Sequence, residues 1–182
     1  MIVYNDIKRQ FVNDVKDNSI ADKILEAIKM RGLNAGHEKE YSSWQNSMQF
    51  MRNIVDDSDI DDEVRICIEY NIPLTSKRVD FIIAGADNYG KDNIVIVELK
   101  QWQKAEVVAD DMHYCVRTYV ANSDRIVCHP SYQAYSYSCF LRNYSQSLTD
   151  EDISLIPCAY LHNYQPEYRQ TLSNPIYKEW TG

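Results

Sequence analysis

Apolar residues in the first third of the chain recur at the three- and four-residue spacing of one helix face. This spacing predicts a helix that begins near Ile20 and stops at Gly32, and a second helix over about 38–55. The apolar stripe of the second helix also contains Glu40, one turn before Trp44. Because a carboxylate on the inward face of a helix is costly to bury alone, we expect Glu40 to have a partner.

The middle third changes to the alternating pattern of β-strands. Residues 64–72 alternate between apolar and polar, which predicts a strand with one solvated face, and Pro73 ends it. A second strand is predicted over about 78–84. A third, over 93–100, is almost entirely apolar, as expected of a strand covered on both faces. The acidic run 56–63 is predicted to be a solvated loop, because it lacks the glycine and the final glutamate of a calcium-binding loop.

The last third mixes both patterns. The segments 113–120 and 125–128 predict a hairpin around the turn 121–124. A proline in the first turn predicts a helix over about 130–145, and residues 155–161 predict a last strand. Helices, three strands, a helix and a strand in this order indicate a mixed α/β domain with a mostly consecutive sheet.

Composition narrows the class of protein. A chain of 182 residues is the size of one domain, and 45% hydrophobic with 25% charged residues excludes disorder throughout. No apolar run reaches the ~20 residues of a membrane span, and the first residues do not form a signal peptide, so we expect a soluble, cytoplasmic protein without membrane association. The five cysteines contain no CxxC pair and are expected to be reduced thiols.

The net charge of −8 counts against a module that only grips phosphate backbones, and it counts less against an enzyme that gathers carboxylates. Glu98 and Lys100 lie two residues apart and therefore on one face of their strand. Asp80, in the preceding strand, can approach Glu98 if the two strands form a hairpin. Two such carboxylates repel unless a cation lies between them, and oxygen ligands favour Mg²⁺ or Mn²⁺.

The backbone carbonyl of Leu99 could complete the inner coordination shell. Lys100 would then lie beside a metal-bound water, where it could orient that water, help to deprotonate it, or neutralise phosphate charge. This is the chemistry of phosphodiester hydrolysis. The alternative from the same residues is a buried Asp–Lys–Glu salt-bridge cluster in a purely structural sheet.

The motif residues also resemble a known family. Asp80, followed eighteen positions later by Glu98-Leu99-Lys100 on the next strand, resembles the PD-(D/E)XK nuclease signature. Glu40, on an upstream helix, is similar to the acidic residue that many of these nucleases place before the sheet. The resemblance implies a restriction-endonuclease-like core, with a mixed central sheet flanked by helices. It also implies a catalytic Mg²⁺ or Mn²⁺ whose ligands include Glu40.

Downstream, Gln133 and Tyr137 are similar to the QxxxY motif of RecB-like members, and four residues of separation put them on one helix face. The resemblance implies that these two residues orient the nucleophile and the DNA backbone. Alternatively, they simply belong to a half-buried amphipathic helix.

The resemblance to the family covers about residues 38–162, the expected catalytic core. It is weakest for the helical N-terminal segment, residues 1–55. The whole chain, residues 1–182, is expected to be a single nuclease-like domain.

The sequence around these motifs (for example VIVELKQWQKAE and HPSYQAYSY) resembles the amino-terminal domain of bacterial proteins with a downstream Schlafen-like superfamily-1 ATPase. The chain has no GxxxxGK[ST] motif, so it is expected to be either a piece of such a protein or a stand-alone relative. The leading hypothesis is a metal-dependent nuclease that prefers DNA to RNA and that could form oligomers. The alternative is a catalytically silent module that binds nucleic acid or a partner and guides an attached ATPase or helicase.

Further residues have weaker support as site residues. Glu69 could face the site. His129 could contact a phosphate or simply cap the helix that follows it. Trp102 and the many tyrosines could stack on unpaired bases, although most should belong to the core. Four basic residues could form a rim for nucleic acid or be ordinary solvated charges: Lys77, Arg78, Lys91 and Lys104.

Overall fold

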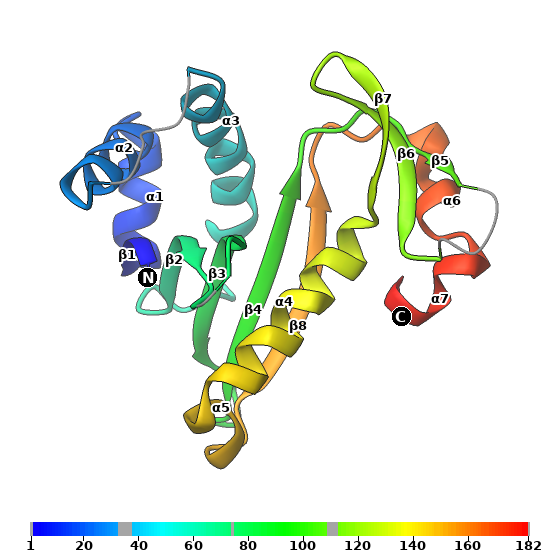
Figure 1. Ribbon diagram of the computed structural model, residues 1–182. Helices are drawn as coiled ribbons and strands as arrows, with labels where there is room; N and C mark the ends of the chain where they lie inside the picture. The colour runs from blue at the N-terminus through cyan, green and yellow to red at the C-terminus, as the bar shows by residue number, and fades with distance from the viewer. Residues whose placement is uncertain (1, 33–37, 74, 109–112, 182) are drawn as a thin grey trace.

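A five-stranded mixed sheet organises the protein, which a computed structural model describes over residues 2–32, 38–73, 75–108 and 113–181 (Figure 1). The strands are ordered β1-β2-β3-β4-β8; the first four are antiparallel to their neighbours, and β8 is parallel to β4. They are β1 (Ile2–Ile7), β2 (Arg65–Asn71), β3 (Arg78–Ala86), β4 (Asp92–Lys100) and β8 (Ser154–Leu161). The expected mixed α/β class is therefore confirmed.

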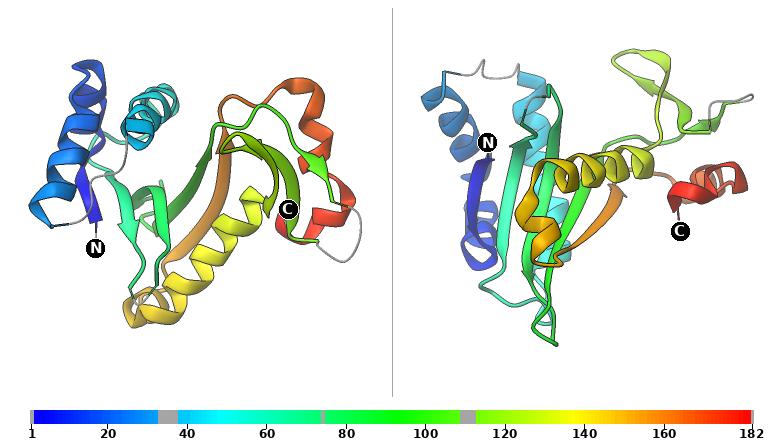
Figure 2. Two further views of the ribbon diagram at one scale, coloured as in Figure 1. Left: turned by 45° about the horizontal axis from the view of Figure 1, so that its top comes forward. Right: turned by 60° about the horizontal axis from the view of Figure 1, so that its bottom comes forward.

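Helices cover both faces of this sheet (Figures 1 and 2). One face, through Ile68, Phe81 and Val97, packs against α1, α2 and α3. The other face, through Ile82 and Ile96, packs against α4. The helices are α1 (Lys8–Lys16), α2 (Ile20–Met30), α3 (Glu38–Val55), α4 (Pro130–Tyr144) and the short α5 (Gln146–Asp150). The sheet is thus the middle layer of three, which explains the apolar sequence of β4.

Most predicted elements are confirmed to within two residues. These are α3, the three strands of the middle third, α4 and β8. The helix predicted from Ile20 is also present. The start of α4 agrees in detail, because Pro130 occupies its first turn and Nδ1 of His129 accepts the backbone N–H of Ser131 at 3.2 Å. His129 therefore caps a helix, the simpler of its two expected roles.

The prediction of an entirely helical first third was wrong at its beginning. Residues Ile2–Ile7 form β1, which pairs antiparallel with β2, for example Tyr4 opposite Ile68. Val3 and Tyr4 are adjacent and both buried, so this strand lacks the clean alternation that would have revealed it. The helix α1 follows directly, in a segment that was predicted to be helical but whose bounds the sequence did not give.

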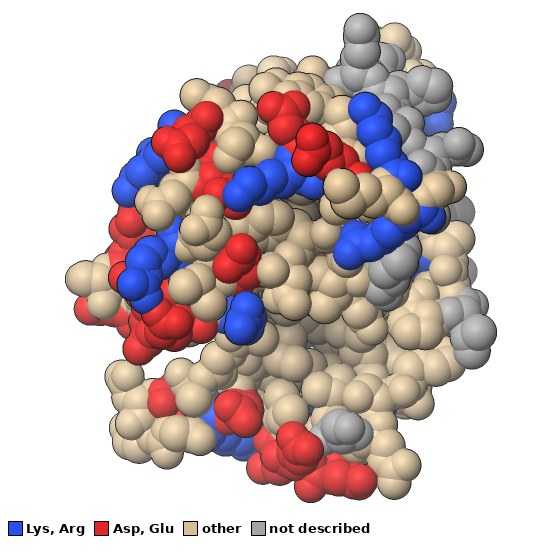
Figure 3. All heavy atoms as spheres, turned by 90° about the vertical axis from the view of Figure 1, so that its left-hand side faces the viewer, with Lys and Arg blue, Asp and Glu red and all other residues tan. Residues whose placement is uncertain are grey.

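The acidic residues of the loop 56–63 are exposed, as predicted, and the loop is also held by contacts with α1. Lys8 of α1 is only 4% exposed; its Nζ donates to the carbonyls of Asp57 (2.8 Å) and Ile60 and pairs with Asp62 at 3.1 Å. Arg9 pairs with Glu63 in the same loop. Figure 3 shows acidic and basic side chains interleaved on this side of the molecule. Much of the negative charge of the loop is therefore paired with α1.

The predicted hairpin belongs to a separate three-stranded sheet of β5 (Glu106–Val107), β6 (Cys115–Val120) and β7 (Ser123–Cys128). Its turn has two residues, Ala121 and Asn122, both with positive φ, where a four-residue turn was predicted. Short C-terminal helices pack against this sheet around the buried Tyr177. These are η1 (Pro166–Tyr168), α6 (Arg169–Leu172), η2 (Pro175–Tyr177) and α7 (Lys178–Thr181). All five cysteines are free thiols.

Candidate functional site

The candidate site lies where β3 and β4 part. Their ladder runs from Ala86 opposite Asp92 to Phe81 opposite Val97 and ends one rung before Asp80 and Glu98 would face each other. Beyond that rung, Oδ2 of Asp80 accepts the backbone N–H of Leu99 at 2.8 Å in place of a backbone partner. Since the N–H and C=O of one strand residue point to the same side, the Leu99 carbonyl faces the same opening.

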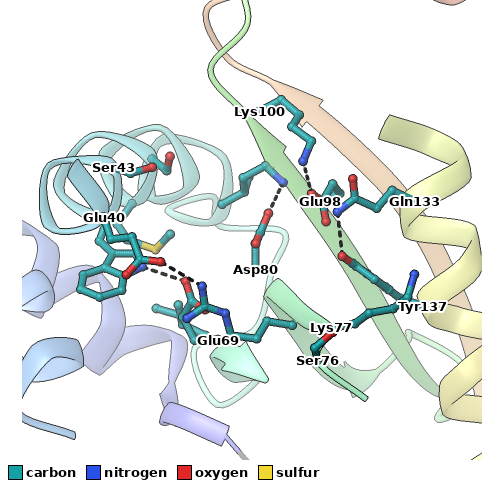
Figure 4. A pocket seen from close by; sticks show the side chains of 16 residues that line it. Glu40, Ser43, Glu69, Ser76, Lys77, Asp80, Glu98, Lys100, Gln133 and Tyr137 are labelled. Atoms are coloured by element: carbon teal, nitrogen blue, oxygen red, sulfur yellow. Dashed lines mark hydrogen bonds and ion pairs between the residues drawn. The ribbon is translucent and has the colours of Figure 1, made fainter. Parts of the chain in front are cut away.

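A pocket of about 450 Å³ occupies this opening, between α3 on one side and α4 on the other (Figure 4). Figure 4 shows Glu98, Gln133 and Tyr137 together, Glu40 beside Glu69 across the pocket, and Asp80 between the two groups. The six side chains of the motifs recognised in the sequence all line this one pocket: Glu40, Asp80, Glu98, Lys100, Gln133 and Tyr137. The backbone of Leu99 contributes as well. Tertiary structure therefore collects residues that span almost a hundred positions of the sequence.

Glu98 is the most deeply buried charge of the pocket, with 1% of its surface exposed. One carboxylate oxygen pairs with Nζ of Lys100, and the other, Oε2, is buried with no hydrogen-bond donor among the described residues apart from the neighbouring Asp80 carboxyl group. Burial, with a further contribution from Asp80, raises the pKa of Glu98 to about 8. Burial also raises the pKa of Asp80, although the Leu99 N–H and Lys100 oppose the shift. The pair therefore retains a proton near neutral pH.

Lys100 closes the pocket on the side of the smaller sheet. Its Nζ lies 5.6 Å from the ring centroid of Trp102, which is buried in the core formed with the C-terminal helices. Trp102 is thus the support of a lysine and is not available to stack on a base, as the sequence had suggested it could be. The cation–π contact holds Lys100 next to Glu98 from the other side.

Gln133 and Tyr137 of α4 point into the pocket and contact each other, with Nε2 of Gln133 2.7 Å from the Tyr137 hydroxyl. Tyr137 is almost fully buried, and burial, together with the nearby Glu98, raises the pKa of its hydroxyl well above the ordinary range. It is therefore a neutral phenol that can donate a hydrogen bond. The predicted placement of both residues on one helix face toward the site is confirmed.

Glu40 has the partner that its position predicted, and this partner is Arg78. Nη2 of Arg78 lies 3.1 Å from Glu40, and Nε lies 3.1 Å from Oε2 of Glu69. The other oxygen of Glu69 accepts the indole N–H of Trp44 at 2.8 Å. Glu69 therefore does line the pocket, but it faces Arg78. No periodicity signalled this arrangement, because Glu69 has a φ of 54°, outside ordinary strand geometry.

The expected basic rim is only partly present. Lys77 and Arg78 line the pocket, and Nζ of Lys77 lies over the rings of Tyr137 (5.9 Å) and Phe140 (5.4 Å). Lys91 instead pairs with Asp152 at 3.2 Å, and Lys104 does not line the pocket. The charged lining residues are four acidic (Glu40, Glu69, Asp80, Glu98) and three basic (Lys77, Arg78, Lys100). With all seven ionised, the pocket carries one net negative charge.

A cluster of hydrogen-bonded polar side chains lies next to the charged residues of the pocket, and the sequence analysis did not predict it. Gln101 donates to Oγ of Ser43 at 2.8 Å and to Oγ of Ser47 at 3.2 Å. Nε2 of His162 lies 3.2 Å from the same Ser47 hydroxyl, and its ring stacks on Phe50. These contacts fasten the ends of β4 and β8 to α3. No signal in the sequence links these residues, because they come from three separate segments.

Two further searches, one for other functional features in the described residues and one for similar known proteins, gave no additional evidence about function. Within the described ranges, no group of three or more His, Cys, Asp and Glu side chains is arranged to hold a metal ion, and no helix is long and apolar enough to cross a membrane. Comparison of the chain with family models, curated proteins and solved structures finds no match to any of them. The function is therefore inferred from the pocket itself.

Proposed function

We propose that this chain is a metal-dependent phosphodiesterase of the nucleic-acid type, a cytoplasmic nuclease with a restriction-endonuclease-like core that prefers DNA to RNA. One observation carries the proposal. The buried Glu98 lies beside the partly buried Asp80 at the point where their strands part, and one oxygen of Glu98 has no hydrogen-bond donor there among the described residues apart from the Asp80 carboxyl group. Two carboxylates this close are unfavourable unless they share a proton or a cation lies between them.

The donor set suits Mg²⁺ or Mn²⁺. Mg²⁺ keeps several waters and is commonly bound by one or two carboxylates, so a cage of three or more protein side chains is not required. Asp80, Glu98 and the Leu99 carbonyl offer hard oxygen ligands around one opening. Such an ion would supply Lewis-acid activation of a phosphoryl oxygen and of water. With all seven charged lining residues ionised, the two positive charges of such an ion would leave the pocket with one net positive charge, which favours a phosphodiester.

The chain's own residues would then act as follows. Lys100 lies against Glu98 and can neutralise charge that develops on the phosphoryl group or orient the attacking water. The neutral Tyr137 hydroxyl, held by Gln133, can donate to a phosphate oxygen and so position the backbone. Lys77, above the Tyr137 ring, adds positive charge at the entrance.

The second candidate function is a catalytically silent module that binds nucleic acid or a partner and guides an attached ATPase or helicase. The excess of acidic side chains in the pocket favours it, because such a lining does not attract phosphates unaided. The two candidates differ in their need for a metal. A nuclease should bind and use a divalent ion at Asp80 and Glu98, whereas the silent module should not depend on these carboxylates.

A cleavage assay on plasmid, linear duplex, single-stranded DNA and RNA, with Mg²⁺, Mn²⁺ or chelator, tests the proposal. Isothermal titration calorimetry of Mn²⁺ into the wild type and Asp80→Asn should show metal binding only in the wild type, with millimolar or tighter affinity. Bound metal should also raise the melting temperature by mass action. Absence of cleavage with every ion, together with DNA binding unchanged by Asp80→Asn, would establish the silent module instead.

A further inference from the structure

We propose that Arg78 is a phosphate-binding residue of this pocket. In the free protein, Glu40 binds the outer edge of the Arg78 guanidinium group, and a phosphate oxygen of the substrate replaces the Glu40 carboxylate there. This inference rests on the proposed function and adds a residue that contacts the substrate. It also gives Glu40 a role other than that of a metal ligand, which the family resemblance implied. Two carboxylates, those of Glu40 and Glu69, share the one guanidinium group of Arg78.

The buried carboxylate of Glu69 holds Arg78 on the side of the guanidinium group that faces the protein interior. Glu69 is 7% exposed, and its Oε2 lies 3.1 Å from Nε of Arg78. The indole N–H of Trp44 holds the other oxygen of Glu69, so the carboxylate cannot rotate away without losing a buried hydrogen bond. Anchoring through Nε leaves the outer edge of the guanidinium group, the two Nη atoms, to face partners nearer the solvent.

The backbone is distorted to build this anchor. Glu69 lies in the left-handed region at φ 54°, an uncommon conformation for a side chain with a Cβ and costly within a strand. Its two neighbours show the consequence: Ile68 packs with the helices α1 to α3, whereas Tyr70 packs with the α4 side. Regular alternation would put these two residues on one face. The side-chain alternation of β2 is therefore interrupted at Glu69, the buried residue that binds Arg78.

Glu40 contacts Arg78 from the opposite, solvent side. The two side chains are 42% and 39% exposed, and Nη2 lies 3.1 Å from the Glu40 carboxylate. Ion pairs this exposed contribute little to stability, so exchange of one oxyanion for another is inexpensive. The Glu40 carboxylate therefore marks a place where an oxyanion is already bound by a pocket arginine. A phosphate oxygen has the charge and the acceptor geometry to replace it.

The position along the strand fits a contact to the substrate backbone. Arg78 comes two residues before Asp80 on β3 and lines the same pocket, with Lys77 adjacent. An Arg78–Glu69 pair is neutral as a unit. The remaining charges would attract a phosphodiester once a divalent ion is bound, and Arg78 would add directed, charge-assisted hydrogen bonds.

The test measures binding, so that it is independent of cleavage. Fluorescence anisotropy of a labelled DNA duplex of about 20 base pairs is followed with Mg²⁺ between about 50 and 300 mM salt. The background variant is Lys100→Ala, which keeps both carboxylates and is expected not to cleave the probe. Arg78→Ala should raise Kd ~10-fold and reduce the slope of log Kd against log[salt] by about 1. Arg78→Lys should restore the slope but only part of the affinity.

Glu40→Gln separates this role from a structural clasp, because it removes the competing carboxylate. It should lower Kd about threefold, opposite in sign to Arg78→Ala. The matched control is Lys91→Ala, which removes an exposed cation that is paired with Asp152 and does not line the pocket; it should leave Kd and slope unchanged. If Glu40→Gln and Arg78→Ala both weaken binding, or if Arg78→Lys fails to restore the slope, Arg78 only fastens α3 to the sheet.

The outcomes separate this inference from the proposed function. If the wild type cuts no nucleic acid but Arg78→Ala still reduces the salt slope, the phosphate contact is supported and the nuclease activity is excluded. If the wild type cuts DNA but Arg78→Ala changes neither Kd nor the slope, the nuclease activity is supported and the phosphate contact is excluded. A wild type that does not bind the duplex overturns the inference.

Discussion

Two regions of this protein bury carboxylates, and they differ in how many hydrogen bonds they provide to them. On the inner face of α1, Asp14 is 3% exposed and accepts hydrogen bonds from the Tyr4 hydroxyl (2.9 Å), Gln10 (2.6 Å) and Lys23 (2.7 Å). In the pocket, Glu98 is similarly buried, yet one of its oxygens has no donor among the described residues apart from another carboxyl group, that of Asp80. The first carboxylate is fully satisfied by its surroundings. The second is not.

The difference indicates which buried charges serve folding and which serve chemistry. A satisfied network such as that of Asp14 stabilises the packing of α1, α2 and β1, and breaking it leaves several polar groups unpaired. An unsatisfied carboxylate next to another one costs stability, so the rest of the fold must hold it in place. Opposite effects on stability should follow from substitutions in the two regions, and opposite effects on activity as well.

The largest expected effect is on catalysis. Lys100→Ala removes the positive group beside Glu98 but leaves Asp80, Glu98 and the Leu99 carbonyl in place. We expect cleavage to fall ~10²-fold or more, the usual scale for a charge-stabilising or proton-transferring group. Metal binding, measured by calorimetry, should persist or tighten because a competing cation is gone. Cleavage as fast as in the wild type would exclude the mechanism even if the fold is correct.

The next effect is on stability in the other region. Asp14→Ala leaves the buried Tyr4 hydroxyl without its partner and removes the ion pair with the exposed Lys23, and it should lower the free energy of unfolding by about 2 kcal/mol. Urea unfolding measures this change. Cleavage per folded molecule should be unaffected, because Asp14 does not line the pocket. A loss of activity in the folded fraction would show that the two regions are not independent.

Glu98→Gln should change stability in the opposite direction. The pKa of Glu98 is about 8 in the folded protein, above its ordinary value of 4.5, because of burial and Asp80. A raised pKa means that the stability contribution of the protonated form is present below pH ~4.5 and is lost as the pH rises toward ~8. Without metal, the wild type should therefore become less stable across this window.

Urea unfolding with chelator at several pH values measures that loss, and Glu98→Gln should flatten it. At a pH of about 8 the variant should be more stable than the metal-free wild type by on the order of 1–2 kcal/mol. Asp80→Asn should act in the same direction, since it also removes one member of the repelling pair. If both variants are less stable than the wild type at that pH, the two carboxylates are structural and the contrast between the regions fails.

The smallest expected effect concerns α4. Gln133→Ala removes the side chain that lies 2.7 Å from the Tyr137 hydroxyl, a neutral contact worth about 1 kcal/mol. We expect kcat/KM to fall about fivefold, through poorer alignment of the substrate, with no change in metal affinity. Asn143→Ala, an exposed residue on the same helix but outside the pocket lining, is the control. Equal losses in both variants would assign the effect to the helix as a whole.

The elements that have their own periodicity could be predicted from the sequence alone. The helix α3, the strands β2, β3 and β4, and the capped start of α4 at Pro130 all follow from local patterns, which need no knowledge of distant segments. The approach of Asp80 to Glu98 also followed, because two consecutive strands pair as a hairpin and their spacing fixes which residues meet.

Other features depend on contacts between distant segments and could not be predicted in this way. The strand β1 exists because β2 accepts it as a neighbour, and the acidic loop is ordered because Lys8 is buried beneath it. The pairing of Glu40 with Arg78, and the left-handed backbone of Glu69 that supports it, depend on contacts between α3, β2 and β3. Periodicity reports which face of one element is buried, whereas charge pairing and strain arise between elements, where sequence distance carries no information.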